Sequence, residues 1–167
     1  MNKSDLRYQK TEIAIRDAYL KLKKSNSAVS VKDLCEAAMI NKTTFYGHYE
    51  TMESLHKQVC TEFVADMLSH CDKIDGLLNA PRDFIVSVYR LFSGNRAAID
   101  QLYGTDFNML LKDIENILMD QFIPNNMDDD ARLTVQFCIG GSFRILLYES
   151  APNCIQKTVE LVEKVLA

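Results

Sequence analysis

Residues 30–49, SVKDLCEAAMINKTTFYGHY, decide the fold of this 167-residue chain. Ser30 and Asp33 form a pattern typical of a helix N-cap with a carboxylate close to the first-turn amides. Asn41 is a second side chain able to cap free amides, which predicts that another short helix begins at Lys42. Two short helices joined by a tight turn form a helix-turn-helix motif.

The second of these helices presents side chains that suit a nucleic acid. It offers a cation, hydroxyls, a phenol and an imidazole from Lys42, Thr43, Thr44, Tyr46 and His48. Such groups match base edges and phosphates. The same run taken alone is also typical of ordinary exposed residues on a small helical core, so the surrounding sequence has to decide between the two interpretations.

The segment from about residue 8 to residue 55 resembles the DNA-binding domain of the TetR family of bacterial transcriptional regulators. The residues that carry this resemblance are Ile15, Asp17, Ala18, Leu20, Leu22, Ser30, Val31, Asp33, Leu34, Glu36, Ala37, Ala38, Asn41, Lys42, Thr44, Phe45, Tyr46, His48 and Tyr49. Two positions depart from the family pattern: Met39 stands where glycine is common in the turn, and Met52 where many members have a phosphate-binding lysine. The lysine contact is therefore not carried over, and the backbone of the turn stays open because positive φ disfavours a non-glycine residue.

The resemblance implies a transcriptional function and a set of DNA-binding residues. It implies a homodimer that binds a palindromic double-stranded DNA operator, acts as a repressor more often than as an activator, and is released by a small-molecule effector. The residues expected at the major groove are Lys42, Thr43, Thr44 and Tyr46. Ser30, Asn41, His48 and Tyr49 complete the predicted DNA-binding set, near phosphates or in support of the helix.

Charge is distributed unevenly along the chain, whose formal net charge is −4 and whose pI is near 5.4. Residues 1–49 carry nine Lys or Arg against five Asp or Glu, a net charge of +4, whereas residues 50–167 carry ten against eighteen, a net charge of −8. A basic head on an acidic body is expected of a DNA-binding module joined to a regulatory body, because only the surface near phosphates needs to be positive. Chance asymmetry is the alternative.

Apolar periodicity predicts helices throughout the chain, without sustained strand alternation. We expect an all-α fold of about nine helices: a three-helix DNA-binding domain at residues 1–50, linked by a long helix to a ligand-sensing and dimerisation domain at residues 51–167. The predicted helices are 8–24, two within 30–49, 51–74, 81–92, 96–103, 106–122, 128–148 and 152–167. Apolar runs are too short for a membrane span and no export signal is apparent, so a soluble cytoplasmic protein without a membrane partner is expected.

Neither catalysis nor a cofactor is expected. The five cysteines lack the spacing of a zinc site or a disulfide framework, although a regulator controlled by cysteine oxidation stays an alternative. The sequence has no G-x-S-x-G, phosphate-binding glycine loop or H-E-x-x-H motif. His56 and Cys60 have helical i, i+4 spacing, but a nucleophile and its base need a third orienting group. A further alternative is a protein-interaction module with a helix-turn-helix fold that does not bind DNA.

The last two helices are predicted to form a dimer interface. Apolar residues fall on all sides of the helix at 128–148, and Gly140 and Gly141 in its middle each cost about 1 kcal/mol relative to alanine unless another helix approaches closely. The alternative is a helix buried within one monomer. The predicted interface residues are Phe137, Gly140, Gly141, Ile145, Tyr148, Ile155, Val159 and Val162.

A ligand pocket is predicted from the aromatic and methionine-rich residues of the body. They are Phe63, Met67, Phe84, Tyr89, Phe92, Tyr103, Phe107, Leu110 and Phe137. Such a set can line an apolar cavity in which tyrosine hydroxyls orient the ligand. Plain core packing is the alternative for each residue. Because no charged cluster belongs to the set, an apolar or amphipathic effector is expected.

Overall fold

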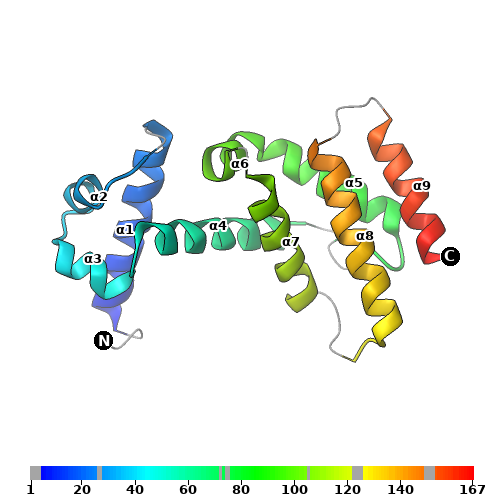
Figure 1. Ribbon diagram of the computed structural model, residues 1–167, viewed down its shortest axis with the longest axis horizontal. Helices are drawn as coiled ribbons and strands as arrows, with labels where there is room; N and C mark the ends of the chain where they lie inside the picture. The colour runs from blue at the N-terminus through cyan, green and yellow to red at the C-terminus, as the bar shows by residue number, and fades with distance from the viewer. Residues whose placement is uncertain are drawn as a thin grey trace. The chain divides into compact units, whose positions relative to one another are not determined.

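The computed structural model describes residues 5–25, 28–71, 73, 76–104, 106–121, 126–148 and 153–167. Within these ranges the chain forms nine helices and no strand, which confirms the predicted all-helical fold (Figure 1). The helices are α1 (Leu6–Ser25), α2 (Val31–Ala37), α3 (Lys42–His48), α4 (Met52–Ser69), α5 (Pro81–Gly94), α6 (Arg96–Tyr103), α7 (Phe107–Gln121), α8 (Asp129–Tyr148) and α9 (Cys154–Leu166). None of these described helices is long and apolar enough to cross a membrane.

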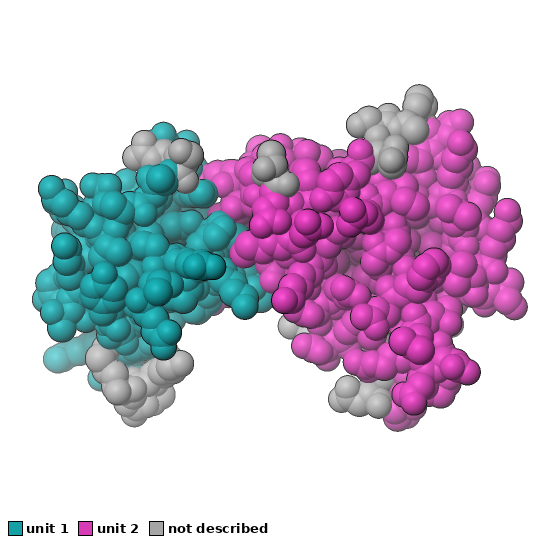
Figure 2. Space-filling model, viewed as in Figure 1, with its two compact units in different colours: residues 1–61 teal, residues 62–167 magenta. Residues whose placement is uncertain are grey.

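The chain divides into two compact units, residues 1–61 and residues 62–167, which Figure 2 colours separately. We refer to them as unit 1 and unit 2. The division falls inside α4, which therefore contributes residues to both units. The boundary expected from the sequence, between residues 50 and 51, precedes this helix.

Unit 1 has one apolar core at which its helices meet. Ile15 of α1, Leu34 of α2, Phe45 of α3 and Leu55 of α4 are all fully buried. α2 packs against both α1 and α3. Burial of a side chain of this size contributes about 1.5–3 kcal/mol. The core therefore stabilises α2 and α3, which are too short to be stable helices in isolation.

The turn between α2 and α3 is a Schellman motif with Met39 at its centre. The amide of Met39 donates to the carbonyl of Glu36 at 3.2 Å, and the amide of Ile40 donates to the carbonyl of Cys35 at 3.0 Å. Met39 adopts a φ of 54° and its side chain is 92% exposed. A non-glycine residue in this left-handed region costs about 1–2 kcal/mol. The turn thus keeps the glycine-type geometry although methionine occupies the position.

Unit 2 is a helical body in which α8 packs against both α7 and α9, while α5 also packs against α9 (Figure 1). Its core buries Phe84 and Val88 of α5, Phe143 of α8 and Val159 of α9. Phe92 meets Phe143 edge-on, with ring centroids 5.3 Å apart. These contacts join three helices of unit 2 around one apolar interior.

Residues at the starts of several helices of unit 2 stabilise the first turn. Pro81 occupies the first turn of α5. Asp106 accepts the amide of Met109 at 3.2 Å before α7, and Asp128 accepts the amide of Ala131 at 2.9 Å before α8. The carboxylates satisfy amides that have no partner within their own helix.

α4 is shorter than predicted. It ends at Ser69, whereas the predicted helix ended at residue 74. The amides of His70 and Cys71 form i→i−3 bonds of 3.2 and 3.0 Å, which tighten the last turn. The hydroxyl of Ser69 donates to the carbonyl of Asp66 at 2.7 Å. The Ser69 hydroxyl and the tightened last turn end the helix. The prediction rested on the spacing of apolar residues, which carries no information about these polar contacts.

Two further predicted boundary residues, Phe122 and Pro152, lie outside the described residues. The described part of α7 ends at Gln121, and α9 begins at Cys154 with Asn153 in the N-cap position.

Candidate nucleic-acid interface

α3 is held at both ends, which gives its exposed face a fixed orientation. At the N-terminus, Oδ1 of Asn41 accepts the amide of Thr44 at 2.7 Å and the Thr44 hydroxyl at 3.0 Å. In the middle of the helix, Phe45 is fully buried in the core of unit 1. At the C-terminus, the amide of Tyr49 donates to the carbonyl of Phe45 at 2.9 Å. The opposite side of α3 is left for solvent.

Lys42, Thr43 and Tyr46 are the predicted groove residues that lie on this exposed side. Tyr46 is 56% exposed, and its ring rests edge-on against Phe45 at 5.2 Å between centroids. Because residues three and four apart share one face of a helix, the ammonium, the hydroxyl and the phenol project together. They form a polar, cationic surface of the kind that recognises base edges and phosphates.

Ser30, Asn41 and Thr44, also predicted to act at DNA, are engaged in helix capping. The Ser30 hydroxyl donates to Oδ2 of Asp33 at 2.7 Å and accepts the Asp33 amide at 3.2 Å. The Thr44 hydroxyl donates its proton to Asn41 and retains its acceptor lone pairs. These side chains fix the starts of α2 and α3. They therefore contribute to the candidate interface mainly by positioning the helices that form it.

Tyr49, the last member of the predicted DNA-binding set, is only 3% exposed. Its hydroxyl donates to Oε1 of Glu12 on α1 at 3.4 Å, and its ring lies 6.1 Å from that of Phe45. Tyr49 therefore supports α3 from within unit 1.

His48 lies at the end of α3 with its ring stacked on Tyr8 of α1. The ring centroids are 3.9 Å apart and the planes differ by 23°. Both ring nitrogens are buried, and neither has a hydrogen-bond partner among the described residues. Burial lowers the pKa of His48, while the negative charge of Glu12 opposes this shift. The imidazole is therefore held as a neutral group at neutral pH.

Sequence reasoning did not identify Tyr8 and Glu12 as parts of this surface. Both lie on α1, and no local spacing connects them with α3. The helical period of α1 is the pattern from which they could have been found. Residues 8, 12, 15 and 19 fall on one face of this helix, and three of them, Tyr8, Ile15 and Tyr19, are buried. A polar Glu12 within that apolar face indicates a partner in the core.

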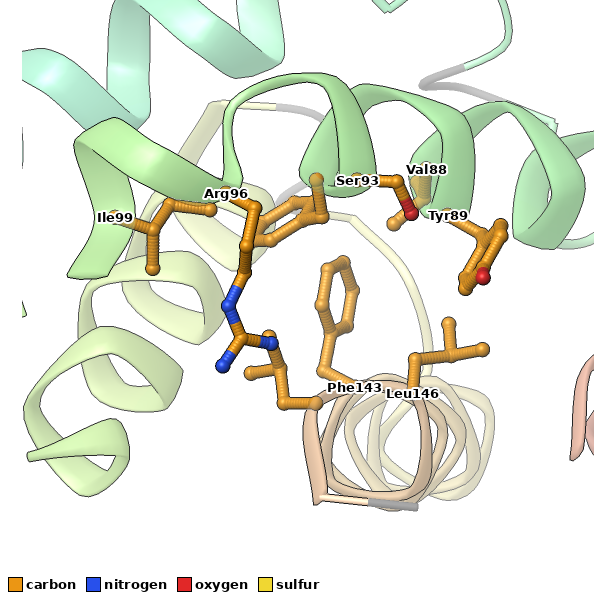
Figure 3. Close-up of a pocket in the computed structure, with 9 residues that line it drawn as sticks. Val88, Tyr89, Ser93, Arg96, Ile99, Phe143 and Leu146 are labelled. Atoms are coloured by element: carbon orange, nitrogen blue, oxygen red, sulfur yellow. The ribbon is translucent and has the colours of Figure 1, made fainter. Parts of the chain in front are cut away.

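A pocket of about 390 Å³ opens in unit 2 between α5, α6 and α8 (Figure 3). It is lined by Val88, Tyr89, Phe92, Ser93, Arg96, Ile99, Phe143, Leu146 and Leu147. Most of these side chains are aromatic or aliphatic. Arg96 is the charged member of the lining, and no arginine belonged to the predicted pocket.

The lining of this pocket differs from the set expected from the sequence. Tyr89 and Phe92 belong to both. The predicted residues that do not line it are Phe63, Met67, Phe84, Tyr103, Phe107, Leu110 and Phe137. Tyr103 is buried and donates to Oδ2 of Asp113 at 2.8 Å, whereas Phe137 is 69% exposed. Apolar spacing selects the inward face of a helix, but the packing of neighbouring helices decides which inward residues border open space.

An apolar groove of about 230 Å³ runs between α8 and α9. It is lined by Phe137, Cys138, Gly141, Ser142, Ile145, Thr158, Leu161, Val162 and Val165. A methyl group at Gly140 or Gly141 would meet no atom of the described residues within 4 Å. The hydroxyl of Ser142 is buried without a hydrogen-bond partner among the described residues. Space over the glycine pair is thus open within one chain.

The other residues predicted for the dimer interface occupy different positions. Val159 is fully buried inside unit 2, and Ile155 is half-buried. Tyr148 is exposed on one side and meets the ring of Phe107 edge-on at 5.1 Å. Val159 therefore contributes to the core of its own chain rather than to an open surface.

Within unit 1, Tyr19, His56 and Cys60 form a second polar cluster. The Tyr19 hydroxyl lies 2.8 Å from Nδ1 of His56, and the Cys60 sulfur lies 3.6 Å from Nε2 of the same ring. Burial raises the pKa of Tyr19 to about 12, with a further contribution from Cys60. Cys60 is fully buried. The described residues contain no group of three or more His, Cys, Asp or Glu side chains that could hold a metal ion.

All five cysteines are thiols outside any disulfide. Cys35, Cys60, Cys71 and Cys138 are buried, and Cys154 is half-buried. Burial raises the pKa of the Cys138 thiol. Because the thiolate is the reactive form, this shift makes Cys138 less reactive toward oxidants at neutral pH.

Comparisons with known proteins bear on the fold as a whole. No protein-family model matches the sequence, and no curated protein matches it either. Among solved structures, the chain is similar to a TetR transcriptional regulator from Rhodococcus sp. RHA1, with a TM-score of 0.58 and 14% sequence identity over 96% of this chain and 98% of that chain. At this identity the likeness shows the fold. The resemblance drawn from residues 8–55 is thus confirmed for the fold of nearly the whole chain.

Proposed function

We propose that this chain, which has the fold of a TetR transcriptional regulator, is a dimeric, sequence-specific DNA-binding regulator of transcription. The observation that carries the proposal is the exposed face of α3, where Lys42, Thr43 and Tyr46 project from a helix whose opposite side is fixed by Phe45. A helix of this kind enters the major groove in helix-turn-helix proteins. The net charge of +4 over residues 1–49 supports the same partner.

Dimerisation is the second part of the proposal. A helix-turn-helix protein binds a palindromic operator as a two-fold dimer, because each recognition helix reads one half-site. The groove between α8 and α9 supports association at this face, since Phe137, Leu161 and Val165 are exposed around it. Exposed apolar surface that lines a groove is typical of an interaction site. Close approach of a second chain over Gly141 would use the open space there.

Release by a ligand is the third part. We propose a repressor that leaves its operator when a small amphipathic molecule occupies the pocket of unit 2. Because α4 contributes residues to both units, a change in unit 2 reaches unit 1 through a continuous helix. A hundredfold loss of operator affinity needs a difference in ligand binding of about 2.7 kcal/mol between the two states, an ordinary coupling energy.

The test of DNA binding is selection from a random duplex library, followed by electrophoretic shifts at low and moderate salt. We expect enrichment of a palindrome and an affinity that falls steeply as salt rises. Failure to enrich any sequence and absence of a shift at low salt would instead favour the interaction module without DNA binding. Genome-wide mapping of binding sites would then identify the regulated genes.

A further inference from the structure

The pocket of unit 2 combines an apolar interior with one permanent positive charge. Phe92 and Phe143 form its aromatic wall, with ring centroids 5.3 Å apart. Tyr89 and Ser93 add hydroxyl groups from α5 (Figure 3). The volume of about 390 Å³ lies near the lower end of the roughly 300–1,000 Å³ that small-molecule sites occupy. The expected occupant is therefore small, with a largely apolar body.

The side chain of Arg96 is 52% exposed, and two contacts orient it. Its Nε donates to Oδ1 of Asp100 one turn later on α6 at 2.8 Å, and its guanidinium carbon lies 5.4 Å from the centroid of the Phe107 ring. Figure 3 shows the side chain extending from the start of α6 alongside Phe143. The bond to Asp100 uses Nε, so the terminal nitrogens of the guanidinium remain as donors at the pocket.

These groups select among possible ligands by charge. A guanidinium presents a planar pair of donors that matches a carboxylate, and a charge-assisted bond of this kind is about twice as strong as a neutral one. A cationic ligand would be repelled by Arg96. A neutral ligand would contact the apolar walls equally well but would give the guanidinium no anionic partner.

We propose that this pocket binds a small molecule in which an aromatic or branched aliphatic body carries a carboxylate, and that Arg96 is the partner of that carboxylate. The body packs between Phe92, Phe143 and Leu146, and the carboxylate lies at the α6 end of the pocket. The inference names the class of effector for the proposed function and rests on that function only for its regulatory consequence. It also narrows the apolar or amphipathic effector expected from the sequence to an anionic amphipathic one.

The test uses the full chain without DNA and three probes that share one body: 4-phenylbutyrate, 4-phenylbutyramide and 4-phenylbutylamine. Calorimetry or nuclear magnetic resonance titration measures each dissociation constant. We expect the acid to bind at least about tenfold more tightly than the amide, and the amine to bind most weakly. Arg96→Gln should reduce acid binding to the level of the amide while leaving amide binding within about twofold, because the apolar walls remain.

Arg144→Gln is the matched control, since Arg144 is an exposed arginine on α8 that lies 5.2 Å from the Tyr148 ring and does not line the pocket. It should leave the preference for the acid unchanged. Leu146→Trp fills the pocket without altering Arg96, so it should weaken acid and amide alike. This second variant keeps the test decisive if Arg96→Gln unfolds.

Equal affinity for the acid and the amide would overturn the inference, as would loss of the acid preference in Arg144→Gln. Failure of all three probes to bind at about 5 mM would overturn the pocket itself as an anion site. Operator release is measured separately. Acid binding that depends on Arg96 but leaves operator affinity unchanged would support this inference while contradicting the proposed ligand control.

Discussion

Unit 1 and unit 2 are both helical, yet they place their functional residues in different ways. In unit 1 the exposed face of α3 follows directly from a short sequence, because Asn41 caps the helix and Phe45 anchors it. In unit 2 the pocket at Arg96 is assembled from α5, α6 and α8, and α8 lies far along the chain from the other two. A binding surface on one helix is therefore a local property, whereas a cavity depends on how several helices pack.

The largest effect is expected in unit 2, from Gly141→Arg. A methyl group at Gly141 meets no described atom within 4 Å, so one chain can accommodate the substitution. A second chain packed there would bury an unpaired charge, at a cost of about 3–5 kcal/mol. The variant should sediment as a folded monomer and lose operator binding.

Gly94→Arg is the control for this change, because Gly94 is equally open within one chain, lies at the end of α5 and does not line the groove. It should remain dimeric. A Gly141→Arg protein that stays dimeric at micromolar concentration would move the interface elsewhere.

The next effect is expected in unit 1, from the double change Lys42→Ala, Tyr46→Ala. Each dimer loses two copies of each contact, so operator affinity should fall by several kcal/mol at about 1–3 kcal/mol per base contact. Loss of the lysine should also flatten the dependence of affinity on salt. Electrophoretic shifts over a salt series measure both, with Lys112→Ala on α7 as an exposed control. Unchanged operator binding in the double variant would mean that α3 does not enter the groove.

A matched pair of cap variants compares the two units directly. Asn41→Ala removes two hydrogen bonds at the start of α3, whereas Asp106→Ala removes one at the start of α7. We expect a loss of about 1–2 kcal/mol in the free energy of unfolding for the first and about 0.5–1 kcal/mol for the second. Denaturant titration measures both. Operator affinity should fall in Asn41→Ala alone, and an equal fall in both variants would contradict a local role for the cap.

A smaller effect of opposite sign is expected from Met39→Gly. Glycine adopts the φ of 54° without steric cost but loses more backbone entropy on folding, so the net gain in the free energy of unfolding should be about 0.5–1 kcal/mol. Met39→Ala serves as the control, because alanine keeps the Cβ atom that causes the strain. No gain for glycine over alanine in denaturant titration would argue against strain in this turn.

The smallest effect concerns protonation of His48. Its pKa is lowered from 6.5 by burial, so the unfolded chain binds a proton at a higher pH than the folded chain does. Stability contributed by the neutral ring is therefore present above pH 6.5 and is lost as pH falls below it. Nuclear magnetic resonance titration of the ring should show a midpoint below 6.5, and Glu12→Gln should lower it further. A midpoint above 6.5 would contradict burial as the dominant influence.

Sequence reasoning succeeded where a residue acts on its near neighbours. The caps at Ser30 and Asn41 were predicted because a capping side chain bonds an amide three residues away. It did not identify Arg96 at the pocket, since a charged residue at the start of a helix looks like ordinary exposed surface. The early end of α4 was also missed. The hydroxyl of Ser69 competes for a helix carbonyl, and the periodic spacing of apolar residues cannot predict this contact.

The contacts of α1 with α3 show the same limit. Tyr8 stacks on His48, and Glu12 accepts a hydrogen bond from Tyr49, but neither pair has a spacing that sequence patterns recognise. Helical period could have placed Tyr8 and Glu12 on an inward face. It could not have named their partners, because that requires the angle at which the helices cross.

The codon of Met39 also limits which amino acids can replace this residue during evolution. A single nucleotide change in a methionine codon reaches leucine, lysine, arginine, isoleucine, valine or threonine. The last three have a branched Cβ that is poorly suited to a φ of 54°. Glycine and asparagine, the residues best suited to this φ, need more than one change. Replacement by a better-suited residue therefore takes at least two changes, and a route through isoleucine, valine or threonine would give an intermediate with a less stable turn.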